Sequence, residues 1–171
     1  DAGWETDSLQ LTWAKGSRPA KGRNLAIAEW PTASPRACAD YVLFCGLQPM
    51  AIVEAKRRRV NVPSHLPQAE RYARDFRLQA PLRIAGEGAA AGPWDDGQSG
   101  HFIVPFAYAC NGRPYIAQLA EQSGIWYRDL RSPANSRRPL QGFHSPQGLL
   151  ELIARDQALA LQQLHNEPMA Y

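Results

Sequence analysis

The chain has 171 residues, of which 44% are hydrophobic and 20% charged, and its formal net charge is +3. This length suits one domain with a buried core. No apolar run approaches the ~18 residues of a membrane helix, and no secretory signal pattern opens the sequence. We therefore expect a globular cytoplasmic protein, whose modest positive charge permits a nucleic-acid partner without requiring one.

The first part of the chain predicts short elements. Gly3 is typical of a helix C-terminus, so we expect that a helix ends just before Asp1 and that the chain is cut from a longer polypeptide. Residues 9–13 alternate and are predicted as a short strand, the basic residues 15–21 as a loop, and residues 25–30 as a strand beside the next element.

Residues 39–56 predict a β-hairpin, because two apolar, β-branched and aromatic arms flank a turn with Gly and Pro. If the loop comprises Gly46–Gln48, antiparallel pairing sets Asp40 directly opposite Glu54. Directly opposed residues share a face, with Cβ atoms about 5 Å apart. The hairpin therefore brings two carboxylates together.

Lys56 is predicted to stand beside Glu54, because residues two apart share a face, while Val53 and Ala55 face the core. One face of the strand would be apolar, and the other would carry the ionisable residues. Two carboxylates at this separation repel by about 1 kcal/mol in water and about 4 kcal/mol in a surface-like dielectric. We therefore expect a cation between Asp40 and Glu54, and Mg²⁺ suits such all-oxygen ligands.

Glu29 and the run Arg57, Arg58 and Arg59 each allow two interpretations. Glu29 is a further metal ligand or a solvent-facing strand residue. The arginines are an exposed strand end or contact phosphates, where each neutralised phosphate adds salt-dependent affinity. The sequence leaves both questions open.

A helix is predicted from Leu66 to Leu78, with Ser64 as N-cap and Pro67 in its first turn. Gln68 and Tyr72 are four residues apart and share one side of this helix. Tyr72 is a core residue, or the pair positions DNA or supports the carboxylates.

The remaining chain predicts loops, strands and one further helix. The expected elements are a strand at 81–84, a turn-rich segment at 86–100 with solvated Asp95 and Asp96, a strand at 102–109, a turn at Asn111-Gly112, strands at 114–119 and 125–129, a basic linker at 132–139, and a helix from Ser145-Pro146 through about Leu164.

Cysteine and histidine chemistry has little support. The three cysteines, Cys38, Cys45 and Cys110, lack CxxC or Cys/His ligand spacing, and we expect buried, reduced thiols. The four histidines lack mutual ligand spacing, and no GxSxG elbow occurs.

Having reached these residues, we find that the chain resembles the N-terminal nuclease region of the R (restriction, motor) subunit of type I restriction-modification enzymes, within the PD-(D/E)xK nucleases. The resemblance covers about residues 3–129, with Ala39 where the family motif has Pro. It rests on Ala39–Leu43, Val53–Arg57, Gln68–Ala73, Val104–Phe106 and Asn111–Pro114.

This resemblance implies an α/β, restriction-endonuclease-like fold with a mixed central sheet flanked by helices. It implies that Asp40 and Glu54 bind Mg²⁺, with the Val53 carbonyl as an added ligand, and that Lys56 is the catalytic lysine. Gln68 and Tyr72 match the family's QxxxY motif, which supports DNA cleavage, and the adjacent arginines, 57–59, are expected DNA contacts.

The resemblance also implies a division of the chain and a set of partners. Residues 1–131 would be the nuclease domain, with its first helix missing upstream, and residues 132–171 a linker and helix leading to an absent motor. The implied partners are double-stranded DNA and the methylation (M) and specificity (S) subunits, with no membrane. ATP would serve only the absent motor, because this chain carries none of the Walker motifs.

The primary hypothesis is therefore an endonuclease that hydrolyses DNA phosphodiester bonds with Mg²⁺, after ATP-driven translocation by the motor. A noncatalytic DNA-docking or subunit-interface module would use the basic clusters equally well but would not need the Asp, Glu and Lys set. A stand-alone repair nuclease of the same fold is the second alternative.

Overall fold

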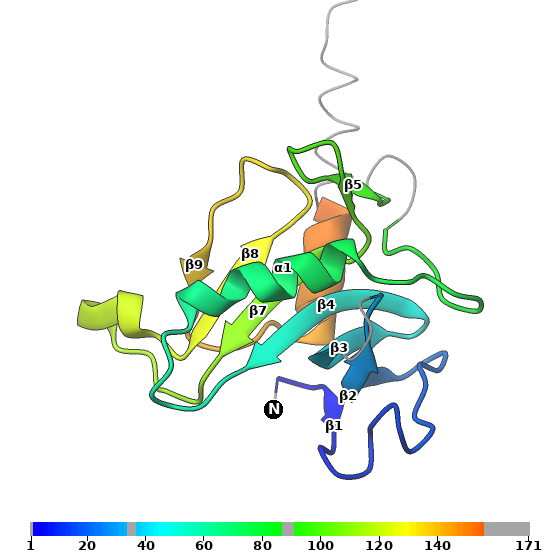
Figure 1. The fold of residues 1–171 in the computed structure, drawn as a ribbon, viewed down its shortest axis with the longest axis horizontal. Helices are drawn as coiled ribbons and strands as arrows, with labels where there is room; N and C mark the ends of the chain where they lie inside the picture. Colours follow the sequence, from blue (N-terminus) through cyan, green and yellow to red (C-terminus); the bar gives the residue numbers. More distant parts are fainter. Residues whose placement is uncertain (1, 34–36, 87–90, 156–171) are drawn as a thin grey trace, which may run out of the picture.

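The computed structural model describes residues 2–33, 37–86 and 91–155, and a mixed β-sheet forms its centre (Figure 1). Within these residues the sheet has seven strands in the order β1-β2-β3-β4-β7-β8-β9. Their bounds are β1 Glu5–Thr6, β2 Asn24–Pro31, β3 Cys38–Cys45, β4 Gln48–Ala55, β7 Phe106–Cys110, β8 Ile125–Asp129 and β9 Arg138–Pro139. A separate two-stranded sheet pairs β5 (Trp94–Asp95) with β6 (His101–Phe102).

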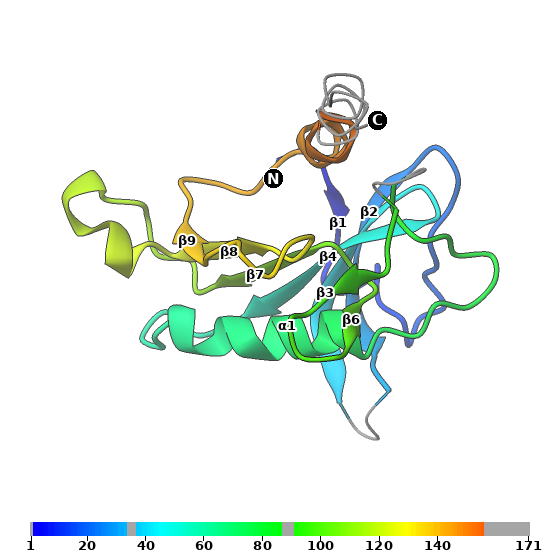
Figure 2. The ribbon, with the colours of Figure 1, turned by 90° about the horizontal axis from the view of Figure 1, so that it is seen from above.

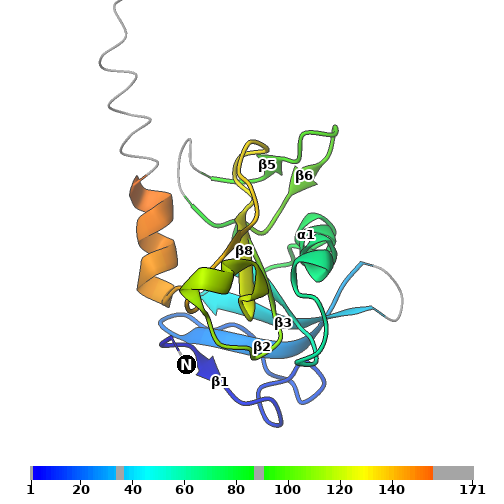
Figure 3. The same cartoon turned by 90° about the vertical axis from the view of Figure 1, so that its left-hand side faces the viewer.

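Helices lie on both faces of the large sheet. Helix α1 (Leu66–Arg74) covers one face, and a helix described over residues 146–155 covers the other, as Figures 2 and 3 show from two directions. In the described part of the chain, 3₁₀ helices η1 (Pro63–His65) and η3 (Ala117–Gln122) lie in the connections. The predicted mixed α/β architecture with flanking helices is thus confirmed. None of the helices in the described ranges is long and apolar enough to cross a membrane.

Strand β4 contributes to two separate hydrophobic cores. Successive strand residues point to opposite faces, so Ile52 packs with Leu66 beneath α1 while Val53 packs with Leu149 beneath the other helix. Burying side chains of this size contributes about 1.5–3 kcal/mol each. Both faces of β4 are therefore covered by apolar side chains. The expectation that one face is apolar and the other carries only ionisable residues is wrong.

The β3–β4 hairpin has the predicted register but not the predicted turn. Cys45 pairs with Gln48, so the loop has two residues rather than three, and Gly46 adopts a φ of 58° there. A bulge between Leu43 and Phe44 then shifts the register by one residue, and Tyr41 pairs with Val53. The shorter loop and the bulge compensate for each other, so Asp40 still faces Glu54 as predicted.

Strands β4 and β7 are parallel neighbours and end at the same edge of the sheet. Ala55 pairs with Cys110, and the Lys56 amide donates to the Cys110 carbonyl at 2.7 Å. The crossover between the two strands carries α1, as parallel strands require a long connection. The loop that follows β4 and the loop that follows β7 therefore begin side by side.

Helix α1 is shorter than predicted and begins differently. It ends at Arg74 rather than Leu78, and its N-cap is His65, without a side-chain cap hydrogen bond. The Ser64 hydroxyl donates instead to the Asn61 carbonyl at 2.9 Å, because η1 precedes the helix. Pro67 lies in the first turn as expected.

Several predicted strands are absent or divided in the described residues. Residues 9–13 form turns with one isolated bridge, Thr12 to Ala28, and residues 81–84 form no strand. The strand at 102–109 is divided into β6 and β7, and residues 114–119 contain no strand but lead into η3. The linker at 132–139 contributes β9. Alternating sequence alone does not select a strand, and Leu9, Ile116 and Leu119 of these segments are exposed.

The strand predicted at 125–129 is confirmed as β8, that at 25–30 lies within β2, and the last helix begins at Pro146 as expected. Its predicted continuation to Leu164 lies partly outside the described residues, as do residues 87–90 of the turn-rich segment.

Strand β2 changes direction locally at Glu29, which has a φ of 56° and is exposed. A left-handed conformation is uncommon for a residue other than Gly, Asn or Asp. It turns Trp30 onto the α1 side of the sheet, where its ring packs against Trp13 at 4.7 Å and Phe44 at 4.8 Å between centroids. The Glu29 conformation therefore adds an aromatic cluster to this end of β2.

Candidate active site

Asp40 and Glu54 come together at the open end of the hairpin. The Asp40 amide donates to Glu54 Oε1 at 3.4 Å, and the Ala55 amide donates to Asp40 Oδ2 at 2.8 Å. Each carboxylate thus accepts from the main chain of the opposite strand. The predicted opposition of the two side chains follows from the pairing of Tyr41 with Val53, one step along the hairpin.

Glu54 is buried, with 1% of its surface exposed. Burial and, after it, the nearby Asp40 charge together raise the pKa of its carboxyl to about 7, against the opposing effects of the Asp40 amide and Lys56. A second negative charge at this point is therefore unfavourable unless a cation accompanies it.

Lys56 supplies one such cation. Its Nζ lies 3.4 Å from Glu54 Oε2, and its side chain is 23% exposed. The ammonium therefore reaches from the buried carboxylate to the solvent, and the predicted proximity of Lys56 and Glu54 is confirmed.

The donor set of the hairpin fits a hard divalent cation, because it consists of two opposed carboxylates in a partly desolvated setting. Among the described residues, however, no three His, Cys, Asp or Glu side chains form a group able to hold a metal. Val53 is buried and pairs with Tyr41, and its carbonyl as a ligand stays a prediction. Glu29 is exposed and joins no such group.

Gln68 and Tyr72 interact with each other on α1. Gln68 Nε2 donates to the Tyr72 hydroxyl at 2.9 Å. Tyr72 is 6% exposed and belongs to the core beneath α1. The structure thus supports the core interpretation of Tyr72, while the hydroxyl and amide remain available as a polar pair behind β4, which α1 contacts.

The three arginines form an exposed loop directly after Lys56. Asn111, which the sequence predicts as a turn residue within a segment shared with the family, fixes this loop: its Nδ2 donates to the Arg58 carbonyl at 3.4 Å and the Val60 carbonyl at 3.0 Å. Asn111 is 6% exposed. No local pattern in the sequence indicates this bridge, because it joins residues more than fifty positions apart.

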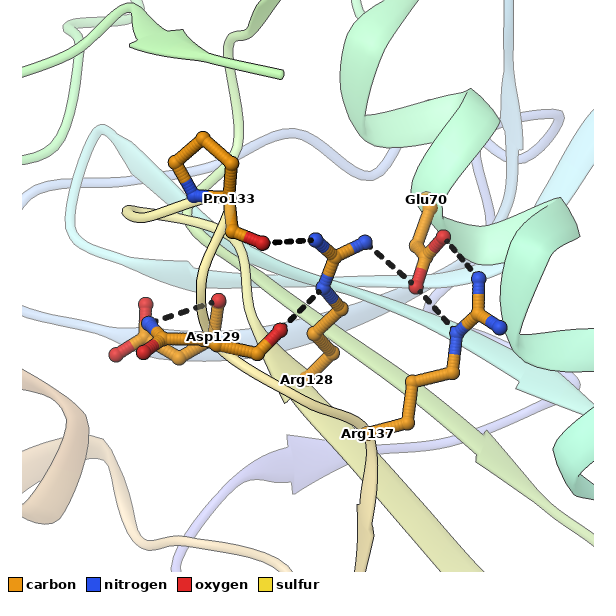
Figure 4. Close-up of polar contacts among 6 residues, drawn as sticks. Glu70, Arg128, Asp129, Pro133 and Arg137 are labelled. Carbon is orange, nitrogen blue, oxygen red and sulfur yellow. Dashed lines mark hydrogen bonds and ion pairs between the residues drawn. The ribbon is translucent and has the colours of Figure 1, made fainter. Parts of the chain in front are cut away.

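Sequence reasoning also missed Glu70, which lies between Gln68 and Tyr72 on α1. Its carboxylate accepts from Arg137 Nε and Nη2 at 2.9 Å each and lies 3.3 Å from Arg128 Nη1 (Figure 4). Burial opposes ionisation, but the two guanidinium groups outweigh it and lower the pKa of Glu70. This network fixes α1 to β8 and to the segment before β9.

Asp95 and Asp96 are predicted to be solvated, but the Asp96 carboxylate is bound by protein groups instead. Its Oδ2 accepts from Arg74 Nε at 2.8 Å, and its Oδ1 accepts from the Gln98 and Gly100 amides. These hydrogen bonds lower its pKa. They join the β5–β6 turn to the end of α1 and contribute nothing to the hairpin carboxylates.

The cysteines are free, and one departs from expectation. Cys45 is buried and Cys110 half-buried, and burial raises the pKa of their thiols to about 12 and about 11. Cys38 is exposed, because it lies at the first, outer position of β3. Thiolate chemistry is therefore disfavoured at the two enclosed positions.

The fold and this site define an α/β domain whose central hairpin carries two opposed carboxylates and an adjacent lysine. Residues 5–153 match the family described as the second domain of the type I restriction enzyme EcoKI endonuclease subunit. The chain belongs to this family, which confirms the type I restriction enzyme assignment.

A curated relative shows the same affiliation. The chain is 42% identical over 172 aligned residues to the type I restriction enzyme EcoKI endonuclease subunit of Escherichia coli (strain K12). The alignment covers 91% of this chain but 15% of the relative, so the chain spans a small part of that protein's length. No solved structure matches the chain.

Proposed function

We propose that this chain is the Mg²⁺-dependent endonuclease domain of a type I restriction-modification enzyme R subunit, with a PD-(D/E)xK site that hydrolyses DNA phosphodiester bonds. The observation that carries the proposal is the opposition of Asp40 and the buried Glu54, with Lys56 at 3.4 Å from Glu54. The relative named as an endonuclease subunit supports the same reaction class.

Asp40 and Glu54 would hold the ion, with the Val53 carbonyl as a further ligand. A bound Mg²⁺ supplies a Lewis acid for the scissile phosphate and an acidified water. Glu54 must be deprotonated to bind it, and its raised pKa makes that step pH-dependent near neutrality. Lys56 would orient the attacking water or stabilise the negative charge that develops on the phosphate.

The surrounding residues would position DNA. Arg57, Arg58 and Arg59 are exposed beside Lys56 and would contact phosphates of double-stranded DNA. Gln68 and Tyr72 would support the carboxylates from α1. The M and S subunits and an ATP-driven motor would select the DNA and deliver it, in the cytoplasm.

The test is DNA cleavage by the complete enzyme that contains this chain. Lys56→Met and Asp40→Asn should reduce plasmid cleavage by at least about a hundredfold, as loss of a group that stabilises the transition state does, while ATP hydrolysis remains. Matched controls are Lys21→Met and Asp75→Asn, which change the same charges outside the site. Cleavage at the wild-type rate by Lys56→Met or Asp40→Asn contradicts the proposal.

A second candidate is a noncatalytic DNA-docking or subunit-interface module. It is favoured by one observation, that Arg57, Arg58 and Arg59 form an exposed loop, which would contact phosphates whether or not the carboxylates hold a metal. Calorimetric titration with Mg²⁺ or Mn²⁺ distinguishes the two functions: heat that disappears in Asp40→Asn supports the nuclease, and no binding supports the docking module.

A further inference from the structure

A pocket lies on the α1 side of the hairpin, at the end of β2. It has a volume of about 230 Å³. Its lining includes Trp13, Arg18, Trp30, Arg77 and Gln79. These residues come from the segment before β2, the end of β2 and the segment after α1, so the fold alone assembles the pocket.

The wall of the pocket presents a flat cation. The Arg18 guanidinium carbon lies 3.3 Å from the centroid of the Trp13 ring, and its Nη1 donates to the Trp13 and Ser17 carbonyls at 3.0 and 2.8 Å. These contacts hold the guanidinium against the indole. Arg18 is exposed, so the opposite plane of the guanidinium is open. Nucleobases stack on such arginine planes as well as on aromatic rings.

The remaining polar groups suit a nucleotide. Arg77 donates to the Ala33 carbonyl at 3.3 Å and provides a second cation at the rim. Gln79 is exposed and carries both a donor and an acceptor, which a base edge requires. Among the described residues that line the pocket, none is Asp or Glu. The lining therefore favours an anionic ligand that also has a flat apolar part.

The size of the pocket limits the ligand. Its volume of about 230 Å³ is below the roughly 300–1,000 Å³ of sites that enclose a whole small-molecule ligand. One base and its phosphate fit this description better than a complete dinucleotide cofactor. The open rim would allow the rest of a strand to continue across the surface.

The position of the pocket relates it to the candidate active site. Trp30 pairs with Ala39, the residue before Asp40. Neighbouring strands lie about 5 Å apart, so roughly 10 Å separates the β2 end from Glu54 on β4. Trp13, on which Arg18 stacks, follows a bridge on the far side of β2, so the base site lies about one strand spacing further out, roughly 15 Å from Glu54, or about four to five nucleotides at 3.4 Å per nucleotide of one DNA strand. The pocket lies on the β2 side of Asp40, and the loop of Arg57, Arg58 and Arg59 lies on the β4 side.

We propose that this pocket holds one unpaired nucleobase of the DNA strand, about four to five nucleotides from the bond to be cut, with the base stacked on Arg18 and its phosphate beside Arg77. The identity of the ligand as DNA rests on the proposed function. Because stacking is tolerant of sequence, the pocket would hold the strand in place without reading its sequence.

The test measures binding, separately from cleavage. The full chain is titrated in EDTA against a fluorescein-labelled ten-nucleotide single strand, by fluorescence anisotropy. Arg18→Gln should weaken binding about tenfold, within the range found when a stacking partner of one base is removed. Lys21→Gln is the matched control in the same basic segment, outside the pocket, and should weaken binding less than threefold.

An abasic version of the same oligonucleotide separates stacking from charge. It should bind the wild type about tenfold more weakly, and Arg18→Gln should then weaken binding no more than Lys21→Gln does. Gln79→Ala, on another segment, should reduce binding of the intact strand a few-fold, which keeps the test valid if Arg18→Gln misfolds. Equal effects of Arg18→Gln and Lys21→Gln on the intact strand overturn the proposal.

Two further arms identify the source of the ligand and the dependence on the active site. Free dAMP that competes at micromolar concentration would show a mononucleotide site and overturn the strand proposal. Titration of Mg²⁺ should be unchanged by Arg18→Gln. If no metal binds at Asp40 and Glu54 but Arg18 still distinguishes intact from abasic DNA, the proposed function fails and the pocket stands.

Discussion

Asp40 and Glu54 face each other across the β3–β4 hairpin, and each carboxylate accepts a hydrogen bond from the main chain of the other's strand. These two bonds orient the carboxylates before any ligand arrives. Glu54 is buried beside the charge of Asp40, and both raise its pKa. The protonation of Glu54 therefore links the stability of the fold to the proposed metal site.

The first prediction concerns the stability of the metal-free protein against pH. The pKa of Glu54 is about 7 when folded, against an ordinary value of 4.5. Because the folded pKa is the higher one, the protonated carboxyl favours the folded state, and this contribution declines as the pH rises from about 4.5 to about 7. At 1.36 kcal/mol per unit, the decline is about 3 kcal/mol.

Urea unfolding in EDTA between pH 4 and pH 8 measures this decline. Glu54→Gln should remove it, so the wild type should lose about 3 kcal/mol relative to the variant over this range. Parallel pH profiles for the two proteins would show that Glu54 ionises normally in the folded state.

The second prediction concerns Glu70. Glu70→Gln should reduce the free energy of unfolding by about 2 kcal/mol, because it removes charge-assisted hydrogen bonds between a buried carboxylate and two arginines that are 16% and 43% exposed. The lowered pKa of Glu70 means that this stabilisation is present at neutral pH and is lost as the pH falls through the folded pKa, below 4.5. Chemical denaturation at pH 7 and at pH 3 measures both effects.

Glu5→Gln is the matched control for Glu70. Glu5 pairs with Arg23, and both side chains are about half exposed, so its loss should cost far less than the loss of Glu70. Equal costs for the two variants at pH 7 would contradict the role given to the Glu70 network.

The third prediction concerns the backbone at Glu29. Its φ of 56° costs a side-chain-bearing residue about 1–2 kcal/mol, which glycine avoids. Glycine loses more entropy on folding, by about 0.5–1 kcal/mol. Glu29→Gly should therefore be about 1 kcal/mol more stable than Glu29→Ala by urea unfolding, and the reverse order would show that the conformation is not maintained in solution.

The fourth prediction concerns Asn111. Asn111→Ala leaves the Arg58 and Val60 carbonyls without their donor and should cost about 1–3 kcal/mol. It should also accelerate hydrogen exchange at the Val60 amide, which donates to the Arg57 carbonyl. Asn135→Ala removes a similar bridge, to the Asp129 carbonyl, and should leave exchange at Val60 unchanged. Unchanged exchange in Asn111→Ala would contradict the support of the arginine loop.

The sequence by itself determined the hairpin, the opposition of Asp40 and Glu54, the proximity of Lys56, and the family. These features depend on neighbours along the chain: alternation sets which residues share a face, and a short loop sets which residues pair. The register was correct although the loop was not, because the bulge at Leu43 restored it.

Only the tertiary structure decided the Asn111 bridge, the Glu70 network and the pocket at Arg18. Each joins residues distant along the chain, and no periodicity or spacing records such contacts. The tertiary structure also decided how far Glu54 is buried. Its position in a strand does not indicate this, but the packing of α1 over the sheet encloses its carboxyl and raises its pKa. Local pattern fixes which side chains can meet, whereas the removal of water around them depends on the packing of the whole domain.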